Sequence, residues 1–179
     1  GNKSAINYHF GSRRGLVDAI LAEHGEVLRI RRALAFEELT VGRATTDLFQ
    51  LCRVLVEPYA SFLADEPSQW AYLAVAQSVL EDPRERPETL PARFRDPLIP
   101  GLIDLMLAQM TLPTELAAER VLVGVGQVIA SVGARARQQL VDVRRRSLSG
   151  TEVFSANLVD MLHGSLIAPA GARTLRAIG

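Results

Sequence analysis

The chain has 179 residues and no formal net charge, because twenty Lys and Arg residues balance twenty Asp and Glu residues. Hydrophobic residues make up 48% of it and charged residues 22%, a composition that supplies a sizeable core and excludes intrinsic disorder. The single cysteine, Cys52, excludes an internal disulfide framework and a zinc site built from several cysteines. The length predicts one domain, or a small domain beside a larger one.

No uninterrupted apolar stretch reaches the roughly 18 residues that a membrane-spanning helix needs. The segment that comes nearest, residues 121–134, is too short to span a membrane and is interrupted by Gln127. The chain also does not open with a charged segment followed by an apolar one, as a secretory signal would. The sequence therefore predicts a soluble, cytoplasmic protein with no membrane partner.

The charges are distributed unevenly along the chain. Residues 1–36 carry a net charge of +3, residues 37–104 carry −6, and residues 105–179 carry +3. A basic N-terminal end on a balanced chain weakly favours a polyanionic partner.

Helical periodicity extends over nearly the whole chain, and strand-like alternation is not found in it. Pro58 is expected to kink the second helix, and the proline-rich residues 83–100 are expected to form a long loop. The sequence predicts an all-α fold, with helices over residues 12–38, 48–62, 67–80, 101–110 and 113–146 and a last one that starts at Thr151.

The first of these helices begins after Ser12, a favourable N-cap residue. Its apolar residues repeat at roughly helical spacing and predict the face that packs against the rest of the protein. They are Leu16, Ile20, Val27, Ile30 and Leu34.

Residues 2–16 read Asn-Lys-Ser-Ala-Ile-Asn-Tyr-His-Phe-Gly-Ser-Arg-Arg-Gly-Leu and predict a short helix, a glycine turn and the start of a longer helix. The amide, hydroxyl, ammonium and imidazole groups on the outer side are types that contact phosphate oxygens and base edges. A solvated helix face is the alternative. Arg13, just after the cap, is placed to bind a phosphate at a helix N-terminus. The candidate DNA-binding residues are Asn2, Lys3, Ser4, Asn7, Tyr8, His9, Ser12 and Arg13.

This segment resembles the recognition helix and the start of the next helix in the tetracycline-repressor-like (TetR) family of transcriptional regulators. Ser4 stands where the family usually has Gly, and Asn7 where it usually has Tyr, which bears on base preference. Arg13 replaces the usual Lys. The residues that agree with the family pattern are Ala5, Ile6, His9, Phe10, Ser12 and Leu16.

The resemblance implies that residues 1–38 hold a helix-turn-helix remnant with its linking helix. Residues 39–179 would form a TetR-type helical ligand-binding and dimerisation bundle. Because the family's recognition helix is its third, two further helices are expected before Gly1. The implied function is that of a ligand-responsive regulator, most often a repressor, which binds operator DNA as a homodimer and is released by a small-molecule effector.

The middle of the chain predicts a ligand pocket, because apolar and aromatic residues there are interspersed with a few polar ones. An ordinary core built from the same residues is the alternative. The candidate ligand-binding residues are Phe49, Cys52, Arg53, Tyr59, Phe62, Trp70, Tyr72, Gln77 and Gln127.

Residues 116–134 form a helix that is apolar nearly all round, whereas a surface helix has a polar face. A second copy of the chain is therefore expected to cover it together with the final helix. The alternative is that the proline-rich segment folds back over these faces. The candidate interface residues are Val121, Gly124, Val125, Val128, Val132, Phe154, Leu158, Met161 and Leu162.

The sequence gives no positive indication of an enzyme, a metal or a cofactor. His9, His24 and His163 lack carboxylates or cysteines at the spacing of metal ligands. The glycines of residues 124–133 lack the spacing of a dinucleotide-binding loop and follow no strand. A dimeric helical ligand-binding protein without DNA recognition, and a helical enzyme, remain the alternative functions.

Overall fold

The computed structural model describes residues 13–41, 45–81, 96–141 and 149–178. Of these described residues 85% are helical, and none forms a strand, which confirms the all-α fold. The elements are α2 (Arg13–Thr40), α3 (Leu48–Ala60), the 3-10 helix η1 (Ser61–Ala64), α4 (Pro67–Leu80), α5 (Leu98–Leu107), α6 (Thr114–Val141), α7 (Thr151–Ile167) and α8 (Ala172–Ile178).

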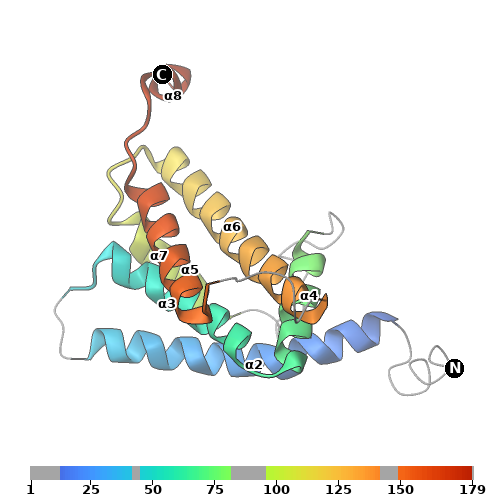
Figure 1. Cartoon of the computed structure of the whole chain (residues 1–179). Coiled ribbons are helices and arrows are strands. Elements are labelled where there is room, and N and C mark those ends of the chain that lie inside the picture. Colours follow the sequence, from blue (N-terminus) through green and yellow to red (C-terminus); the bar gives the residue numbers. More distant parts are fainter. Residues whose placement is uncertain (1–12, 42–44, 82–95, 142–148, 179) are drawn as a thin grey trace, which may run out of the picture.

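Helix α2 forms a long base from which the other helices rise (Figure 1). Helices α3 and α4 both pack on α2, while α6 packs against α4 and α7, and α7 against α3. The short helix α8 stands away from the bundle, and its residues are exposed as far as Ala177. Helices α3 and α4 therefore connect the bundle to α2, the helix that begins within the motif of residues 2–16.

The starts of α3 and α4 follow from local sequence signals. Asp47 caps α3 by accepting a hydrogen bond from the backbone of Gln50 (2.8 Å), whose own side chain faces the Asp47 backbone in a capping box. Pro67 opens α4 in its first turn, where the missing backbone N–H needs no partner. Pro58 lies in the last turn of α3, and the chain then passes into η1.

In the second half, α5 and the number of helices differ from the prediction. Helix α5 ends at Leu107, three residues before the predicted residue 110. Helix α5 begins at Leu98, three residues before the predicted residue 101, because Pro100 lies in the first turn and interrupts no hydrogen bond there. The helix that begins at Thr151 is not the last one, since α8 follows it. Helix α6 is described as far as Val141, and the predicted continuation over residues 142–146 lies outside the described residues.

The core lies where α3, α4, α5, α6 and α7 meet above α2. Every one of its large members is an apolar or sulfur-containing side chain with almost no exposed surface, as expected for a close-packed interior. The largest of them are Phe62, Leu51, Leu63, Leu73, Leu102, Met106, Leu166, Val56, Val132, Val159 and Cys52.

The predicted buried face of α2 is wrong at two of its residues. Ile30 and Leu34 are each more than half exposed, whereas Leu28 and Arg32 are buried. Ile20 and Val27 do pack against the core, and the inward side of α2 also carries Arg31 and Arg32, which pair with Asp65 and Asp96. The inward side of α2 is therefore partly ionic.

Gly133 provides a test of how closely α4 and α6 pack. A Cβ atom at this position would overlap the buried side chain of Gln77, so Gly133→Ala is expected to lower the free energy of unfolding by about 1–3 kcal/mol. Gly25 is the matched control, because a Cβ there has open space, and Gly25→Ala is expected to raise stability by about 0.5–1 kcal/mol. Urea unfolding measures both. Equal effects of the two substitutions would contradict the packing.

Candidate functional site

The predicted DNA-binding residues lie almost entirely outside the described part of the chain. Arg13 is the exception, since its backbone begins α2. Residues 2–12 lie outside the described residues, so their role stays a prediction.

The predicted ligand-binding residues do not form one group. Most of them are buried or half-buried in the interior, where they are distributed over α3, η1 and α4. Trp70 is half-buried and donates a hydrogen bond from Nε1 to the Leu63 carbonyl (3.2 Å). The fully buried members are Cys52, Tyr59, Phe62, Tyr72 and Gln77.

Three of the predicted residues lie outside this interior. The prediction that all nine candidate residues line one pocket is therefore wrong. Phe49 and Arg53 lie one turn apart on the exposed side of α3. Phe49 packs edge-to-face on His163 of α7, with ring centroids 5.3 Å apart. Arg53 pairs with Glu57 one turn later (2.8 Å), an interaction that raises the pKa of Arg53. Gln127 is exposed on α6.

Arg31 holds α2 against the end of η1. Its guanidinium donates a hydrogen bond to Ser61 Oγ (2.6 Å) and forms an ion pair with Asp65 (2.7 Å). The same guanidinium lies 4.8 Å from the centre of the Phe62 ring, within the range of a cation–π contact. Helix α2 is therefore attached to the loop between η1 and α4.

Arg32 holds α2 against the start of α5. Its side chain is almost fully buried, with 6% of the residue exposed, and it forms an ion pair with Asp96. The other carboxylate oxygen of Asp96 accepts a hydrogen bond from the Leu98 backbone N–H (2.9 Å) and so supports the first turn of α5. Asp96 thus joins α5 to α2. Sequence reasoning missed Arg31, Arg32, Asp65 and Asp96.

Two buried tyrosines complete what we call the Arg32 cluster, which consists of Arg32, Tyr59, Tyr72 and Asp96. Burial raises the pKa of Tyr59, and it raises the pKa of Tyr72 to about 12, while the charge of Arg32 opposes both shifts. Both hydroxyls are therefore neutral hydrogen-bond donors near physiological pH, within the electrostatic reach of Arg32.

Two donors of the cluster are buried and have no hydrogen-bond partner among the described residues. They are the hydroxyl of Tyr59 and the Nε of Arg32. Native proteins seldom leave buried donors without an acceptor, so these two groups need an acceptor, such as a water molecule or a ligand, that the described residues do not supply. The cluster is therefore the described polar site with the clearest capacity for a ligand.

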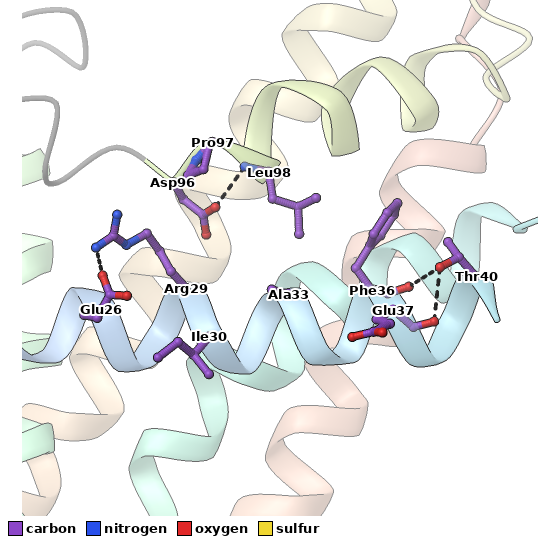
Figure 2. A pocket seen from close by; sticks show the side chains of 10 residues that line it. All are labelled: Glu26, Arg29, Ile30, Ala33, Phe36, Glu37, Thr40, Asp96, Pro97 and Leu98. Carbon is purple, nitrogen blue, oxygen red and sulfur yellow. Dashed lines mark hydrogen bonds and ion pairs between the residues drawn. The ribbon is translucent and has the colours of Figure 1, made fainter.

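An open groove of about 480 Å³ lies beside the cluster, between α2 and the start of α5 (Figure 2). Its walls are mostly apolar, and Asp96 points from its rim toward α2. An ion pair between Glu26 and Arg29 lies at one end, and Thr40 lies at the other. The apolar lining consists of Ile30, Ala33, Phe36, Pro97 and Leu98. Asp96 belongs to both the groove and the Arg32 cluster.

A second, smaller groove of about 260 Å³ lies between α6 and α7. Gln127, Val123 and Ser165 line it, together with Arg120. Arg120 donates hydrogen bonds to the carbonyls of Ser165 (3.1 Å), Ala168 and Pro169 (3.5 Å), which satisfies backbone acceptors at the end of α7. This groove lies on an outer face of the molecule.

The predicted dimer interface needs correction, because most of its residues are buried within the single chain. Helix α6 packs one side against α4 and α7, so the following residues have no surface left for a second copy: Val121, Gly124, Val128, Val132, Leu158 and Leu162. Val125 and Phe154 are half-buried, and Phe154 lies under the guanidinium of Arg135 (5.0 Å). Of the predicted set, only Met161 is exposed.

Other apolar residues of α6 and α7 do face outward. Leu122 is 74% exposed and Val123 is 67% exposed. We use the name α6–α7 outer face for the exposed apolar residues of these two helices, which include Leu122, Val123, Val153, Met161 and Ile167.

Helix α6 is also long and apolar enough to meet the criteria for a membrane-spanning helix. Its most apolar 18-residue window has a mean hydropathy of 1.4, and 33% of that window is buried inside the protein. Mostly buried core helices of soluble proteins meet the same criteria, so one such helix is weak evidence for a membrane span.

Within the described ranges, no group of three or more His, Cys, Asp or Glu side chains is arranged to hold a metal ion. Comparison of the chain with protein-family models, with curated proteins and with solved structures found no match. The features of this chain that bear on function are therefore its sequence motif and the geometry of the described residues.

Cys52 provides a test of the interior. Its thiol is fully buried, and burial raises its pKa from 9.0 to about 12. A raised pKa disfavours the reactive thiolate, so at pH 8 the native protein is expected to react with Ellman's reagent at least a hundredfold more slowly than the protein unfolded in urea. Release of thionitrobenzoate measures both rates. Fast, stoichiometric labelling of the native protein would contradict the burial.

Proposed function

We propose that the chain is a ligand-responsive transcriptional regulator, most often acting as a repressor, which binds operator DNA as a homodimer. The N-terminal motif of residues 2–16 supports this proposal through its resemblance to a recognition helix. The observation that carries it further is α2, which begins at Arg13 within that motif and continues for 28 residues along the bundle. One helix thus connects the polar motif to the Arg32 cluster.

The proposed mechanism uses α2 as the connection between ligand and DNA. Two recognition helices in successive major grooves must lie about 34–36 Å apart. A ligand that favours a different position of α2 changes that separation and releases the operator. The ligand must bind the two arrangements with different affinities, because only such a difference shifts the equilibrium.

The homodimer is supported by the α6–α7 outer face. Leu122 and Val123 on α6 and Met161 on α7 are exposed apolar side chains, and exposed apolar area is unfavourable in water. A second copy related by a two-fold axis would cover the same surface on both chains. This places the proposed contact on residues adjacent to the buried ones that the sequence indicated.

Operator binding tests the proposal through Lys3 and Tyr8. In the chain as its gene encodes it in full, Lys3→Ala is expected to weaken binding to the DNA upstream of that gene and to reduce the salt dependence by about one counterion. Tyr8→Phe removes one hydroxyl and is expected to weaken binding by about 1 kcal/mol. Gel shifts at several salt concentrations measure both effects.

The control for these variants is Arg53→Gln, which changes an exposed charge on α3 far along the chain from the motif. Thermal unfolding should be the same for all of these proteins. A folded wild-type dimer that shifts no DNA would favour a ligand-binding protein without DNA recognition. Unchanged affinity in both the Lys3 and Tyr8 variants would overturn the assignment of the motif.

The dimer is tested by introducing a charge on the α6–α7 outer face. Leu122→Arg or Val123→Arg is expected to convert the dimer to monomer, because each would bury an unpaired charge at the contact. Leu105→Arg on α5 is the matched control, since Leu105 is an exposed apolar residue of another element. Sedimentation velocity measures the oligomeric state. A wild-type protein that is monomeric at micromolar concentration would reject the dimer.

A further inference from the structure

We propose that the Arg32 cluster binds the carboxylate of an effector with an apolar body, and that this carboxylate takes the place of Asp96 on Arg32. The inference rests on the proposed function for its consequence at DNA, but the binding chemistry follows from the cluster itself. It assigns a ligand class to the bundle and a regulatory role to one ion pair.

The cluster holds more buried donors than its own acceptors can satisfy. Both carboxylate oxygens of Asp96 are in use, one on Arg32 and the other on the Leu98 backbone. The hydroxyl of Tyr59 and the Nε of Arg32 are buried donors with no partner among the described residues. The cluster therefore has donors in excess, and a molecule that completes it must bring acceptor oxygens.

The charge and the geometry of the Arg32 guanidinium favour a carboxylate. A guanidinium presents its N–H groups in a planar fork that matches the two oxygens of a carboxylate. Arg32 supplies a single positive charge, so one monoanion leaves the buried cluster neutral once Asp96 has moved out. A phosphate dianion would leave an uncompensated negative charge in the interior, which is unfavourable. The neutral hydroxyl of Tyr59 can donate to the same carboxylate.

Asp96 can leave the cluster, whereas Arg32 cannot. Asp96 lies at the rim of the groove, and its side chain is 13% exposed against 7% for Arg32. A rotation of its side chain brings the carboxylate to water in the open groove. Arg32 extends from the buried side of α2, where movement would require the helix itself to shift.

The rest of the ligand would lie in the open groove between α2 and the start of α5. The groove beside Asp96 has a mostly apolar wall formed by Ala33, Phe36 and Leu98 (Figure 2). Glu26 at one end is paired with Arg29, but Glu37 also lines the groove, so the groove suits the apolar body and the carboxylate is placed at Arg32. An apolar body can lie in this groove while its carboxylate reaches the position of Asp96. Displacing Asp96 also breaks its ion pair with Arg32, which joins α5 to α2.

The test measures ligand binding in the absence of DNA. The probes are benzoate, octanoate and dodecanoate, each paired with its amide, and the readouts are thermal shift and calorimetric titration on the full chain. At least one carboxylate is expected to bind saturably and at least tenfold more tightly than its amide. Failure of all three carboxylates to bind, or equal binding of the amides, would overturn the proposal. Dodecyl phosphate binding as tightly as dodecanoate would also overturn it.

Three variants separate recognition from structure. Asp96→Asn removes the competing carboxylate, so it is expected to bind the carboxylate about tenfold more tightly even though the unliganded protein melts at a lower temperature. Arg32→Gln is expected to lose binding. Tyr59→Phe is expected to weaken binding several-fold without lowering the melting temperature, since the hydroxyl has no partner among the described residues. Arg53→Gln, an exposed arginine of α3, is the matched control and should bind as the wild type does.

Weaker or unchanged binding in Asp96→Asn would overturn the exchange, because a purely structural aspartate gives no gain in affinity. The two proposals fail in different ways. Carboxylate binding with a gain in Asp96→Asn, but without operator release, supports the site and contradicts the proposed regulator. Operator binding in a protein that binds none of the carboxylates supports the regulator and overturns this site.

Discussion

The position of α2 depends on two consecutive guanidinium groups that point into the bundle. Arg31 is held by Ser61 and Asp65 after α3, and Arg32 is held by Asp96 before α5. Between residues 15 and 40 of α2, the buried side chains are Leu28 and Arg32. Removing one partner from a buried ion pair costs about 3–5 kcal/mol, which exceeds what a half-buried aliphatic side chain contributes. The ionic contacts therefore act on this helix together with the apolar side chains that pack against the core, among them Ile20, Val27 and Phe36.

The rest of the interior is arranged around this constraint. Phe62 lies beneath the Arg31 guanidinium and packs edge-on against Tyr72, with ring centroids 5.5 Å apart. Tyr72 in turn lies 5.5 Å from the ring of His24 on α2. Aromatic rings tolerate a cation over their faces and still fill an apolar core. They therefore provide the transition between the ionic side of α2 and the aliphatic centre of the bundle.

The helices themselves were largely predictable, because their signals are local. Asp47 with Gln50 and Pro67 mark helix starts within a few residues of sequence. The orientation of α2 was not predictable in this way. A pattern of apolar residues placed Ile30 and Leu34 inside, whereas the partner of Arg32 lies 64 residues away in the chain. The acidic middle segment was the available signal, but it does not say which of its carboxylates reach α2.

The candidate sites show the same limit. A helix that is apolar all round, such as α6, must be covered on several sides, but its sequence does not say which side meets its own chain. In the structure α4 and α7 cover the side that holds Val121 and Val128, which leaves Leu122 and Val123 outside. In the predicted pocket, Cys52 and Phe62 lie inside, but Arg53 lies outside, because its partner Glu57 one turn away keeps it in solvent. Burial follows from the neighbours that each face acquires on folding.

The close contact between α4 and α6 bears on how a change at α2 could reach the α6–α7 outer face. Gln77 of α4 occupies the space that a side chain at position 133 of α6 would need, so the two helices fit with little room to slide. Helix α4 also packs on α2. Interiors this close-packed transmit displacement instead of absorbing it. In the proposed regulator, loss of the tie between Arg32 and Asp96 would therefore move α2 against α4 and α6 together, and the N-terminal motifs of two joined copies would change their separation.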